Sequence, residues 1–190
     1  MQHDRPTADP TMSSSIDAGS VRRWRIALLH ALDTGSNSDV PCGTCTACCR
    51  SAHFVHVDPD EADTLAHIPA ALLFPAPGLP KGHQVLGYDE LGRCPMLGSD
   101  GCTIYEHRPR ACRVYDCRVF AATEVEITDP AKADIAQRVA QWRFSEDDPG
   151  DRRASDALRR RVAELRADGV VDPTALALGA VRSASFDEPR

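Results

Sequence analysis

Eight cysteines are the residues of this sequence best suited to chemistry, and all of them fall between positions 42 and 117. Thiolates bind metals, form disulfides and act as nucleophiles, so the spacing of the cysteines decides which chemistry to expect. They form two groups, a compact Cys-x2-Cys-x2-Cys-Cys run and a wider second group. The eight candidate ligands are Cys42, Cys45, Cys48, Cys49, Cys94, Cys102, Cys112 and Cys117.

Metal ligation explains this clustering better than disulfides or buried free thiols do. The first 15 residues lack the apolar run of a secretory signal, so we expect a cytoplasmic protein whose thiols stay reduced. Free core cysteines would be scattered along the chain, whereas none occurs in its C-terminal third. Two-residue gaps let successive thiolates surround one metal. The pattern therefore predicts that all eight cysteines are metal ligands.

The spacing favours an iron–sulfur cluster and leaves zinc as the alternative. Structural zinc usually takes two separated Cys-x2-Cys pairs, whereas Cys42, Cys45 and Cys48 form an unbroken run like that of ferredoxin-type loops. Those loops also use a cysteine followed by proline, as at Cys94, so these four are the best set for one [4Fe–4S] cluster. Cys49 is harder to place, because adjacent side chains of an extended segment point to opposite sides. The spacing does not decide whether the cysteines form one metal centre or two.

Histidines and arginines near the cysteines are weaker candidates. His53 and His56 would point to opposite faces of a strand, His107 lies beside the second cysteine group, and the other histidines form no constellation. Most nearby arginines are expected to pair with acids such as Glu106 and Asp116. The sequence has no phosphate loop, nucleophile elbow or His-Glu-x-x-His motif, so it does not decide whether the chain is an enzyme.

Composition restricts the partners. The chain is 42% hydrophobic and 26% charged, which is typical of a soluble globular protein. Its net charge is −6, and no stripe of Lys and Arg suggests a nucleic-acid partner. No stretch approaches the roughly 20 apolar residues of a membrane span. We therefore expect the chain to bind a metal ion or cluster. The composition is also compatible with a protein partner, and we expect binding neither to nucleic acid nor to a membrane.

The elements around the cysteines predict an α+β fold. A helix over 17–33 is expected, with an apolar stripe at three- and four-residue spacing and an end at Gly35. Short strands are expected within 53–57 and 84–105. Asp129-Pro130 and Asp172-Pro173 mark helix starts; between them one helix carries Trp142, a linker covers 146–151 and a second helix follows, and a third helix ends near 181. These elements enclose a small irregular core stapled by metal. The stripe consists of Trp24, Leu28, Ala31 and Leu32. The strands are expected to be antiparallel, with helices at both ends of the fold. The expected division is a disordered N-terminus (1–15), a cysteine-cluster metal-binding domain (16–128), a C-terminal helical region packed on it (129–183) and a frayed tail (184–190).

Residues 42–118 also resemble a known family. After the compact run, the chain reads Cys-Pro-x-Leu, then Gly-Cys-x-Ile-Tyr-Glu-x-Arg-Pro, then Cys-Arg-x-Tyr-x-Cys. This is similar to the YkgJ-type CxxCxxCC cysteine-cluster family, the "putative zinc- or iron-chelating" domain. The resemblance implies a metal-binding domain often described as iron–sulfur-containing, and a related domain occurs in flagellin lysine methylases. It does not cover the helices from Asp129 onwards.

Two functions follow as expectations. The first is a metal-binding protein that carries an iron–sulfur cluster, leaning to [4Fe–4S], with a redox or protein-modification-related role. The alternative is a zinc-binding structural or interaction module, or a metal carrier, without catalysis. An open, solvent-facing thiol near arginines would favour the first, and fully closed all-thiolate sites would favour the second.

Overall fold

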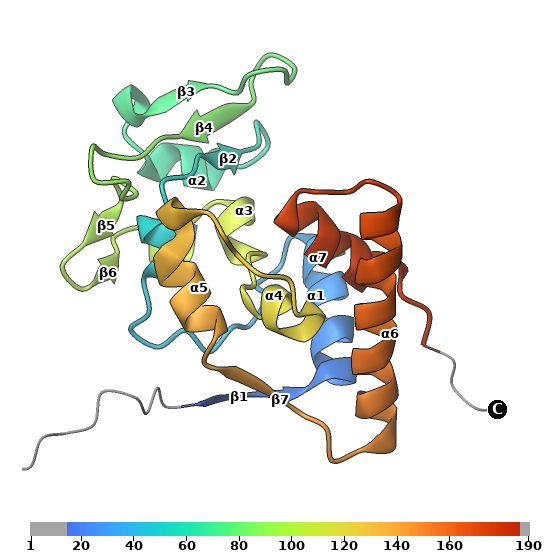
Figure 1. The fold of residues 1–190 in the computed structure, drawn as a ribbon. Helices are drawn as coiled ribbons and strands as arrows, with labels where there is room; N and C mark the ends of the chain where they lie inside the picture. Colours follow the sequence, from blue (N-terminus) through green and yellow to red (C-terminus); the bar gives the residue numbers. More distant parts are fainter. Residues whose placement is uncertain (1–14, 187–190) are drawn as a thin grey trace, which may run out of the picture.

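The computed structural model describes residues 15–186 and has the predicted α+β architecture. Helices occupy both ends of the described chain, and short strands form small sheets between them (Figure 1). Nearly all of the predicted disordered N-terminus and the last four residues of the predicted tail lie outside the described residues. Within 15–186, no helix is long and apolar enough to cross a membrane.

The N-terminal segment is a strand followed by a helix. The helix predicted from position 17 begins later, as α1 (Val21–Thr34), because β1 (Ile16–Ser20) pairs in parallel with β7 (Trp142–Ser145). Ser20 caps α1 by accepting a hydrogen bond from the Arg23 N–H. The helix ends at Gly35, whose left-handed φ of 70° suits glycine and lets its N–H bond the Ala31 carbonyl.

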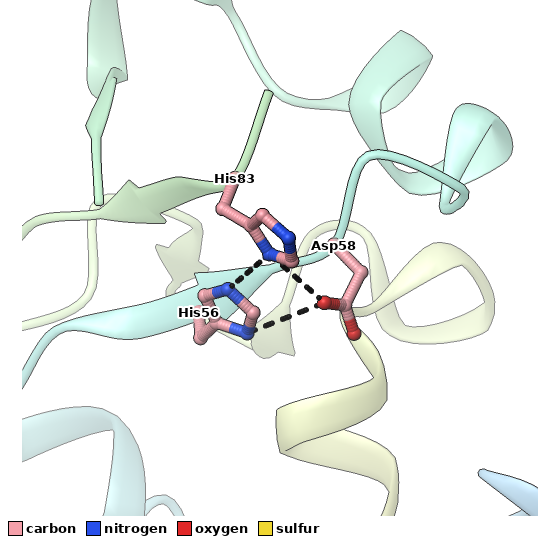
Figure 2. A group of neighbouring side chains, drawn as sticks. All are labelled: His56, Asp58 and His83. Atoms are coloured by element: carbon pink, nitrogen blue, oxygen red, sulfur yellow. Dashed lines mark hydrogen bonds and ion pairs between the residues drawn. The ribbon is translucent and has the colours of Figure 1, made fainter. Parts of the chain in front are cut away.

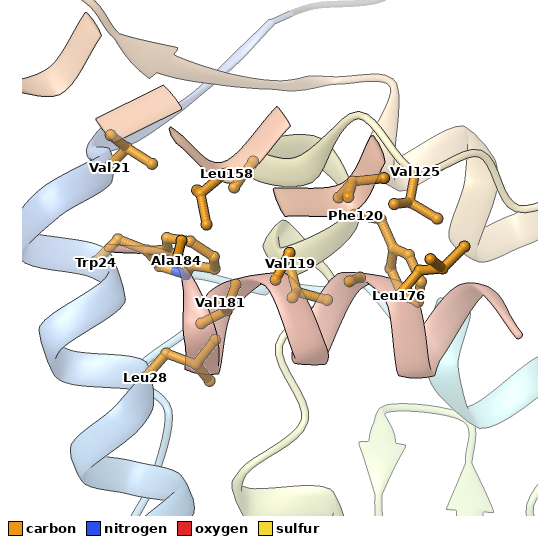
Figure 3. Close-up of a cluster of buried hydrophobic side chains, with 14 of the residues drawn as sticks. Val21, Trp24, Leu28, Val119, Phe120, Val125, Leu158, Leu176, Val181 and Ala184 are labelled. Atoms are coloured by element: carbon orange, nitrogen blue, oxygen red, sulfur yellow. The ribbon is translucent and has the colours of Figure 1, made fainter. Parts of the chain in front are cut away.

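Four helices enclose the main core. They are α1, α4 (Arg118–Thr123), α6 (Pro149–Ala167) and α7 (Pro173–Ser183), and their apolar faces meet in Figure 3. The predicted stripe on α1 is confirmed, since Trp24, Leu28 and Ala31 are buried. The largest contributions from the other helices come from Val119, Phe120, Leu158, Val162, Leu176 and Val181.

The C-terminal helices pack on an element that follows directly after the last cysteine. Because α4 lies in the main core with α6 and α7, residues on both sides of position 128 share one apolar cluster. Ala184 and Phe186 also belong to or pack against that cluster. The division into a metal-binding domain and a helical region stays a prediction, but the two parts contribute to the same core.

Aspartate–proline pairs start several of the C-terminal helices, as predicted. Asp129 caps the short 3-10 turn η4 (Pro130–Lys132), and Asp172 caps α7 by accepting from the Ala175 N–H at 2.7 Å. Asp148 does the same for α6, in a segment read from the sequence as a linker. The helix expected to carry Trp142 ends earlier, as α5 (Ala133–Val139), and Trp142 lies in β7 instead.

The cysteine-rich half is built from short elements around a second, smaller core. A three-stranded antiparallel sheet has the order β2-β4-β3, and β5 pairs with β6 in a two-stranded hairpin. Val57, Ile68, Leu86 and Ile104 are buried between these elements. The elements are η1 (Ala47–Arg50), β2 (Val55–Val57), α2 (Ala62–His67), η2 (Ala70–Leu72), β3 (Leu73–Pro75), β4 (Gln84–Leu86), β5 (Leu97–Gly98), β6 (Gly101–Cys102), η3 (Tyr105–His107) and α3 (Arg110–Arg113).

Candidate metal centre

The compact cysteine run folds into two tight turns rather than an extended segment. In the first turn, the Cys45 N–H bonds the Cys42 carbonyl at 3.0 Å. In the second, the N–H of Cys49 in η1 bonds the carbonyl of Thr46, the residue before η1, at 2.9 Å. The 3-10 geometry brings the sulfurs of Cys48 and Cys49 to 4.0 Å from each other. These two thiols therefore do not point to opposite sides, in contrast to the expectation for an extended chain.

A second set of cysteines lies around the β5–β6 hairpin. The Cys94 N–H donates to the Cys49 carbonyl at 2.8 Å and so ties the two sequence groups together. Leu97, three residues after Cys94, lies in β5 opposite Cys102 in β6. Cys112 lies in α3. Burial raises the pKa of Cys112 to about 12, and the charges of Cys48, Cys94 and Cys102 add to the rise. Cys94, Cys102 and Cys112 are thus electrostatic neighbours.

Cys117 belongs to the other side of the site. Burial, together with the charges of Asp116, Cys42 and Cys45, raises its pKa to about 12. The indole N–H of Trp142 donates to the Cys117 sulfur at 3.3 Å and favours the thiolate. Cys42 is exposed at the surface, but partial burial of its thiol still raises its pKa, with contributions from Cys48 and Cys45. These interactions join Cys117 to the start of the compact run.

The cysteines therefore divide differently from the sequence order. One set of three is Cys42, Cys45 and Cys117, and we call it the outer set. The other is Cys94, Cys102 and Cys112, which we call the inner set. Cys48 acts electrostatically on members of both sets and lies beside Cys49. Cys94, which the sequence assigned to one cluster with Cys42 and Cys45, neighbours Cys102 and Cys112 in the structure.

The donor set suits a soft, positively charged metal centre. Every pKa shift resolved among the eight thiols is upward, because burial and mutual repulsion disfavour their anions. A bound cation removes that repulsion, and thiolates select zinc or iron–sulfur clusters. A single tetrahedral zinc would hold its sulfurs about 3.8 Å apart, given its bond length of about 2.3 Å. Within residues 15–186, no three cysteine sulfurs all lie within 4.8 Å of one another.

An open hollow of about 500 Å³ adjoins the outer set. Cys42 is exposed, and it lines the hollow together with Cys45, Arg50 and residues of α5. Arg138 from α5 donates to the carbonyls of Pro41 at 3.4 Å and Cys42 at 3.3 Å, so this helix holds the loop in place. The outer set can thus be approached from solvent across a surface that carries two arginines.

Most other arginines near the cysteines pair with acids, as expected for Asp116, whereas Glu106 forms no ion pair within residues 15–186. Arg118 pairs with Asp116 at 2.8 Å in the interior, and Asp116 also accepts the indole N–H of Trp24 at 2.8 Å. Arg113 pairs with the buried Glu61 at 3.5 Å. Arg50 differs, since it is exposed and has no hydrogen bond or ion pair with the part of the chain that the structure describes.

Two histidine–aspartate groups were missed by sequence reasoning. Each brings three ligand atoms within 4.8 Å of one another, and neither contains a cysteine. A signal was present for the first group, because His56 and Asp58 are two residues apart on a strand and therefore share a face. The partner histidine is 25 residues further on, so only strand pairing could reveal it. The groups are His56, Asp58 and His83 (Figure 2), and Asp63, His67 and His107.

Comparison with known proteins gives one match. The family model described as "CxxCxxCC: Putative zinc- or iron-chelating domain" matches residues 41–134. The matched segment contains all eight cysteines and ends within α5, which lines the hollow. No curated protein and no solved structure matches the chain. The predicted family is confirmed, and the match supports metal binding without distinguishing zinc from iron.

Proposed function

Since residues 41–134 match the CxxCxxCC model of a putative zinc- or iron-chelating domain, we propose that the chain binds metal in two four-cysteine centres. An iron–sulfur cluster in the outer centre would exchange electrons with a partner that reaches the hollow. The outer centre takes Cys42, Cys45 and Cys117, and the inner centre takes Cys94, Cys102 and Cys112. Each is completed by one thiol of the adjacent pair Cys48 and Cys49.

The division into two sets supports two centres. Electrostatic coupling links Cys117 to Cys42 and Cys45, whereas Cys112 is linked to Cys94 and Cys102. Each set offers three thiolates, and both zinc sites and iron–sulfur clusters commonly take four. The charge of Cys48 raises the pKa of Cys42 in one set and of Cys94 in the other, and its sulfur lies 4.0 Å from that of Cys49, so we assign one thiol of this pair to each centre.

The exposed Cys42 beside the arginine-lined hollow is the observation that supports a redox role. A purely structural site would be closed, whereas this one opens to solvent next to Arg50 and Arg138. A nearby positive charge raises the reduction potential of a cluster, because it stabilises the more negative reduced state.

Three residues around the outer centre would position its ligands and influence its charge. Trp142 donates a hydrogen bond to the sulfur of Cys117, which tunes the electron density of a ligand. Arg138 holds the loop through the carbonyls of Pro41 and Cys42. Arg50 leaves its charge available at the hollow, where it can attract an acidic partner surface.

Ligand variants test the two centres. After anaerobic purification, iron, zinc and acid-labile sulfide are measured in the wild-type protein, in Cys42→Ser/Cys45→Ser and in Cys94→Ser/Cys112→Ser. Two centres predict that each double variant loses the metal of one centre and keeps that of the other. Thr44→Ser, which also lines the hollow, is the matched control and should keep all of it. Loss of all metal from both double variants would establish one shared centre and overturn the proposal.

Arg50 offers a test of the redox role. A visible absorption that bleaches on reduction is expected, and Arg50→Gln should lower the reduction potential because it removes a positive charge at the hollow. Arg153→Gln removes an equally exposed charge on α6 and should leave the potential unchanged. A colourless protein with stoichiometric zinc would refute the redox proposal. It would favour the structural or carrier module instead.

A further inference from the structure

We propose that His56, Asp58 and His83 form a separate site for one divalent transition-metal ion, independent of the cysteines. Two imidazole nitrogens and one carboxylate oxygen would bind the ion and leave coordination positions open to solvent. His56 lies in β2, Asp58 directly follows that strand and His83 directly precedes β4 (Figure 2). Neither the matched family description nor the proposed cysteine centres include them.

Strand register brings the three residues together. In the antiparallel pair β2–β4, His56 is opposite Val85 and Val57 is opposite Gln84. Asp58 follows directly after β2 and His83 directly precedes β4, so continuing this register by one step places the two residues opposite each other. Since side chains alternate, His56 and Asp58 point to the same face, and His83 points to that face from β4.

A tight turn sets the position of His83. The His83 N–H bonds the Pro80 carbonyl at 3.3 Å, and Gly82 between them has a left-handed φ of 105°. A Cβ atom at Gly82 would lie 3.3 Å from the Cβ of Pro59, the residue after Asp58. Glycine thus permits the close approach that places His83 beside Asp58.

The three residues bring ligand atoms within 4.8 Å of one another, with Nε2 of His56 turned to His83 and its Nδ1 lying 3.8 Å from Oδ1 of Asp58. Nε2 of His56 lies 3.1 Å from Nδ1 of His83. The same His83 nitrogen lies 3.2 Å from Oδ1 of Asp58. A tetrahedral zinc with bonds of about 2.0–2.1 Å would separate its ligand atoms by about 3.3–3.4 Å. The two rings have centroids 5.2 Å apart while their nitrogens are 3.1 Å apart, so the nitrogens lie on facing edges. Binding would therefore need only small side-chain rotations.

Arg110 holds the carboxylate of Asp58 in place by a hydrogen bond, as residues next to a metal site commonly do for a metal ligand. Its Nη1 donates to Oδ2 of Asp58 at 2.9 Å, which leaves Oδ1 turned to the histidines. Its Nη2 bonds Asp60 at 3.0 Å. The side chains of His56, His83 and Asp58 are 34%, 24% and 24% exposed, so the site is sheltered but reachable by an ion.

The second histidine–aspartate group is less suitable. The rings of His67 and His107 are stacked face to face, with centroids 3.5 Å apart and planes within 4°. At this short centroid separation one ring lies over the other, so their nitrogen lone pairs run side by side, whereas the rings of His56 and His83, with planes within 14°, are offset to 5.2 Å and meet at their edges. Asp63 is 70% exposed, and Nδ1 of His67 already contacts its backbone carbonyl at 2.8 Å. This group provides a comparison for the experiment.

The ligand types identify the class of ion. Imidazole suits zinc, iron, nickel and copper, and a set of two histidines and one carboxylate with open positions is the arrangement of mononuclear non-haem iron(II) sites. Zinc accepts the same ligands, with three protein groups and an open fourth position. The site is therefore assigned to Fe²⁺ or Zn²⁺ chemistry, for which Co²⁺ is a spectroscopic probe.

Cobalt titration of the full chain tests the site. The protein is purified anaerobically with its cysteine centres loaded, titrated with Co²⁺, desalted and analysed for metal. The wild-type protein should bind one added equivalent with visible d–d bands and no new thiolate charge-transfer band. His56→Gln and His83→Gln should each weaken this binding by more than about 100-fold, beyond the roughly 10–100-fold cost of losing a supporting partner.

His107→Gln and the surface variant His30→Gln are the matched controls and should bind Co²⁺ like the wild type. Thermal unfolding in metal-free buffer checks that each variant is folded, and iron and zinc analysis checks that the cysteine centres are intact. The proposal is overturned if no equivalent is added, if the added ion shows thiolate bands, or if binding is lost in His107→Gln and kept in His83→Gln. Because cysteine-bound metal is counted in the same samples, failure of this site is distinct from failure of the cysteine centres.

Discussion

A buried carboxylate beside the last cysteine is expected to be a strong determinant of stability. The side chain of Asp116 is 1% exposed and accepts hydrogen bonds from the Trp24 indole, the Arg118 N–H and the Arg118 guanidinium. It thereby joins α1 to the start of α4 and adjoins Cys117. Asp116→Ala would leave the guanidinium of Arg118, which is 11% exposed, without its ionic partner.

The structure sets the size of the loss. Removing one partner of a buried ion pair costs about 3–5 kcal/mol, because the remaining charge stays desolvated. In a protein of this length each kcal/mol shifts the melting temperature by about 2–4 °C, so a decrease of about 6–20 °C is expected. The double variant Asp116→Ala/Arg118→Met removes the orphaned charge and should recover at least about 2 kcal/mol of this loss. The indole N–H of Trp24 loses its acceptor in both variants, so recovery is incomplete.

Thermal unfolding followed by circular dichroism, together with urea unfolding, measures these differences. Metal content is determined for each sample, so that an effect on Cys117 is separated from the effect on the core. An Asp116→Ala protein that melts within about 3 °C of the wild type with full metal content would refute the reasoning. So would a double variant no more stable than the single one, since relief of the orphaned charge is the basis of the expected recovery.

Three further perturbations have defined outcomes. Leu158→Ala, at a fully buried position, should cost about 2–5 kcal/mol in urea unfolding, whereas the exposed Leu91→Ala should stay within about 0.5 kcal/mol. Gly35→Ala should cost about 1–2 kcal/mol or more in the same assay, because φ is left-handed and the new Cβ would lie 2.8 Å from Nε of Arg110. Complete, verified metal removal should lower thermal stability and hydrogen-exchange protection in residues 40–120, and unchanged stability would contradict a folding role for the metal.

Local patterns predicted much of the secondary structure. The α1 stripe, its glycine end and the aspartate–proline helix starts at Asp129 and Asp172 follow from spacing and capping, which act within a few residues. The family resemblance was also correct, because it depends on the order of residues along the chain. The sequence interpretation failed at Trp142, where a helical period continued past the true end of α5 into β7.

That failure has a tertiary cause. The strand β7 exists because it pairs with β1, more than 120 residues earlier in the chain, and no local pattern contains that partner. The same pairing shortened α1 at its N-terminal end. In the cysteine segment, the 3-10 turn at Ala47–Arg50 brought Cys48 and Cys49 close together, where an extended chain would have separated them.

The eight cysteines, their confinement to residues 42–117 and their suitability for a metal were determined by the sequence itself, because residue type sets ligand chemistry and short spacing sets what one turn can gather. The tertiary structure decided which thiols are neighbours, which of them faces solvent, and that His83 meets His56 and Asp58. Those relations depend on strand register and packing between segments far apart in the chain, and the free energy that holds them comes from the two hydrophobic cores.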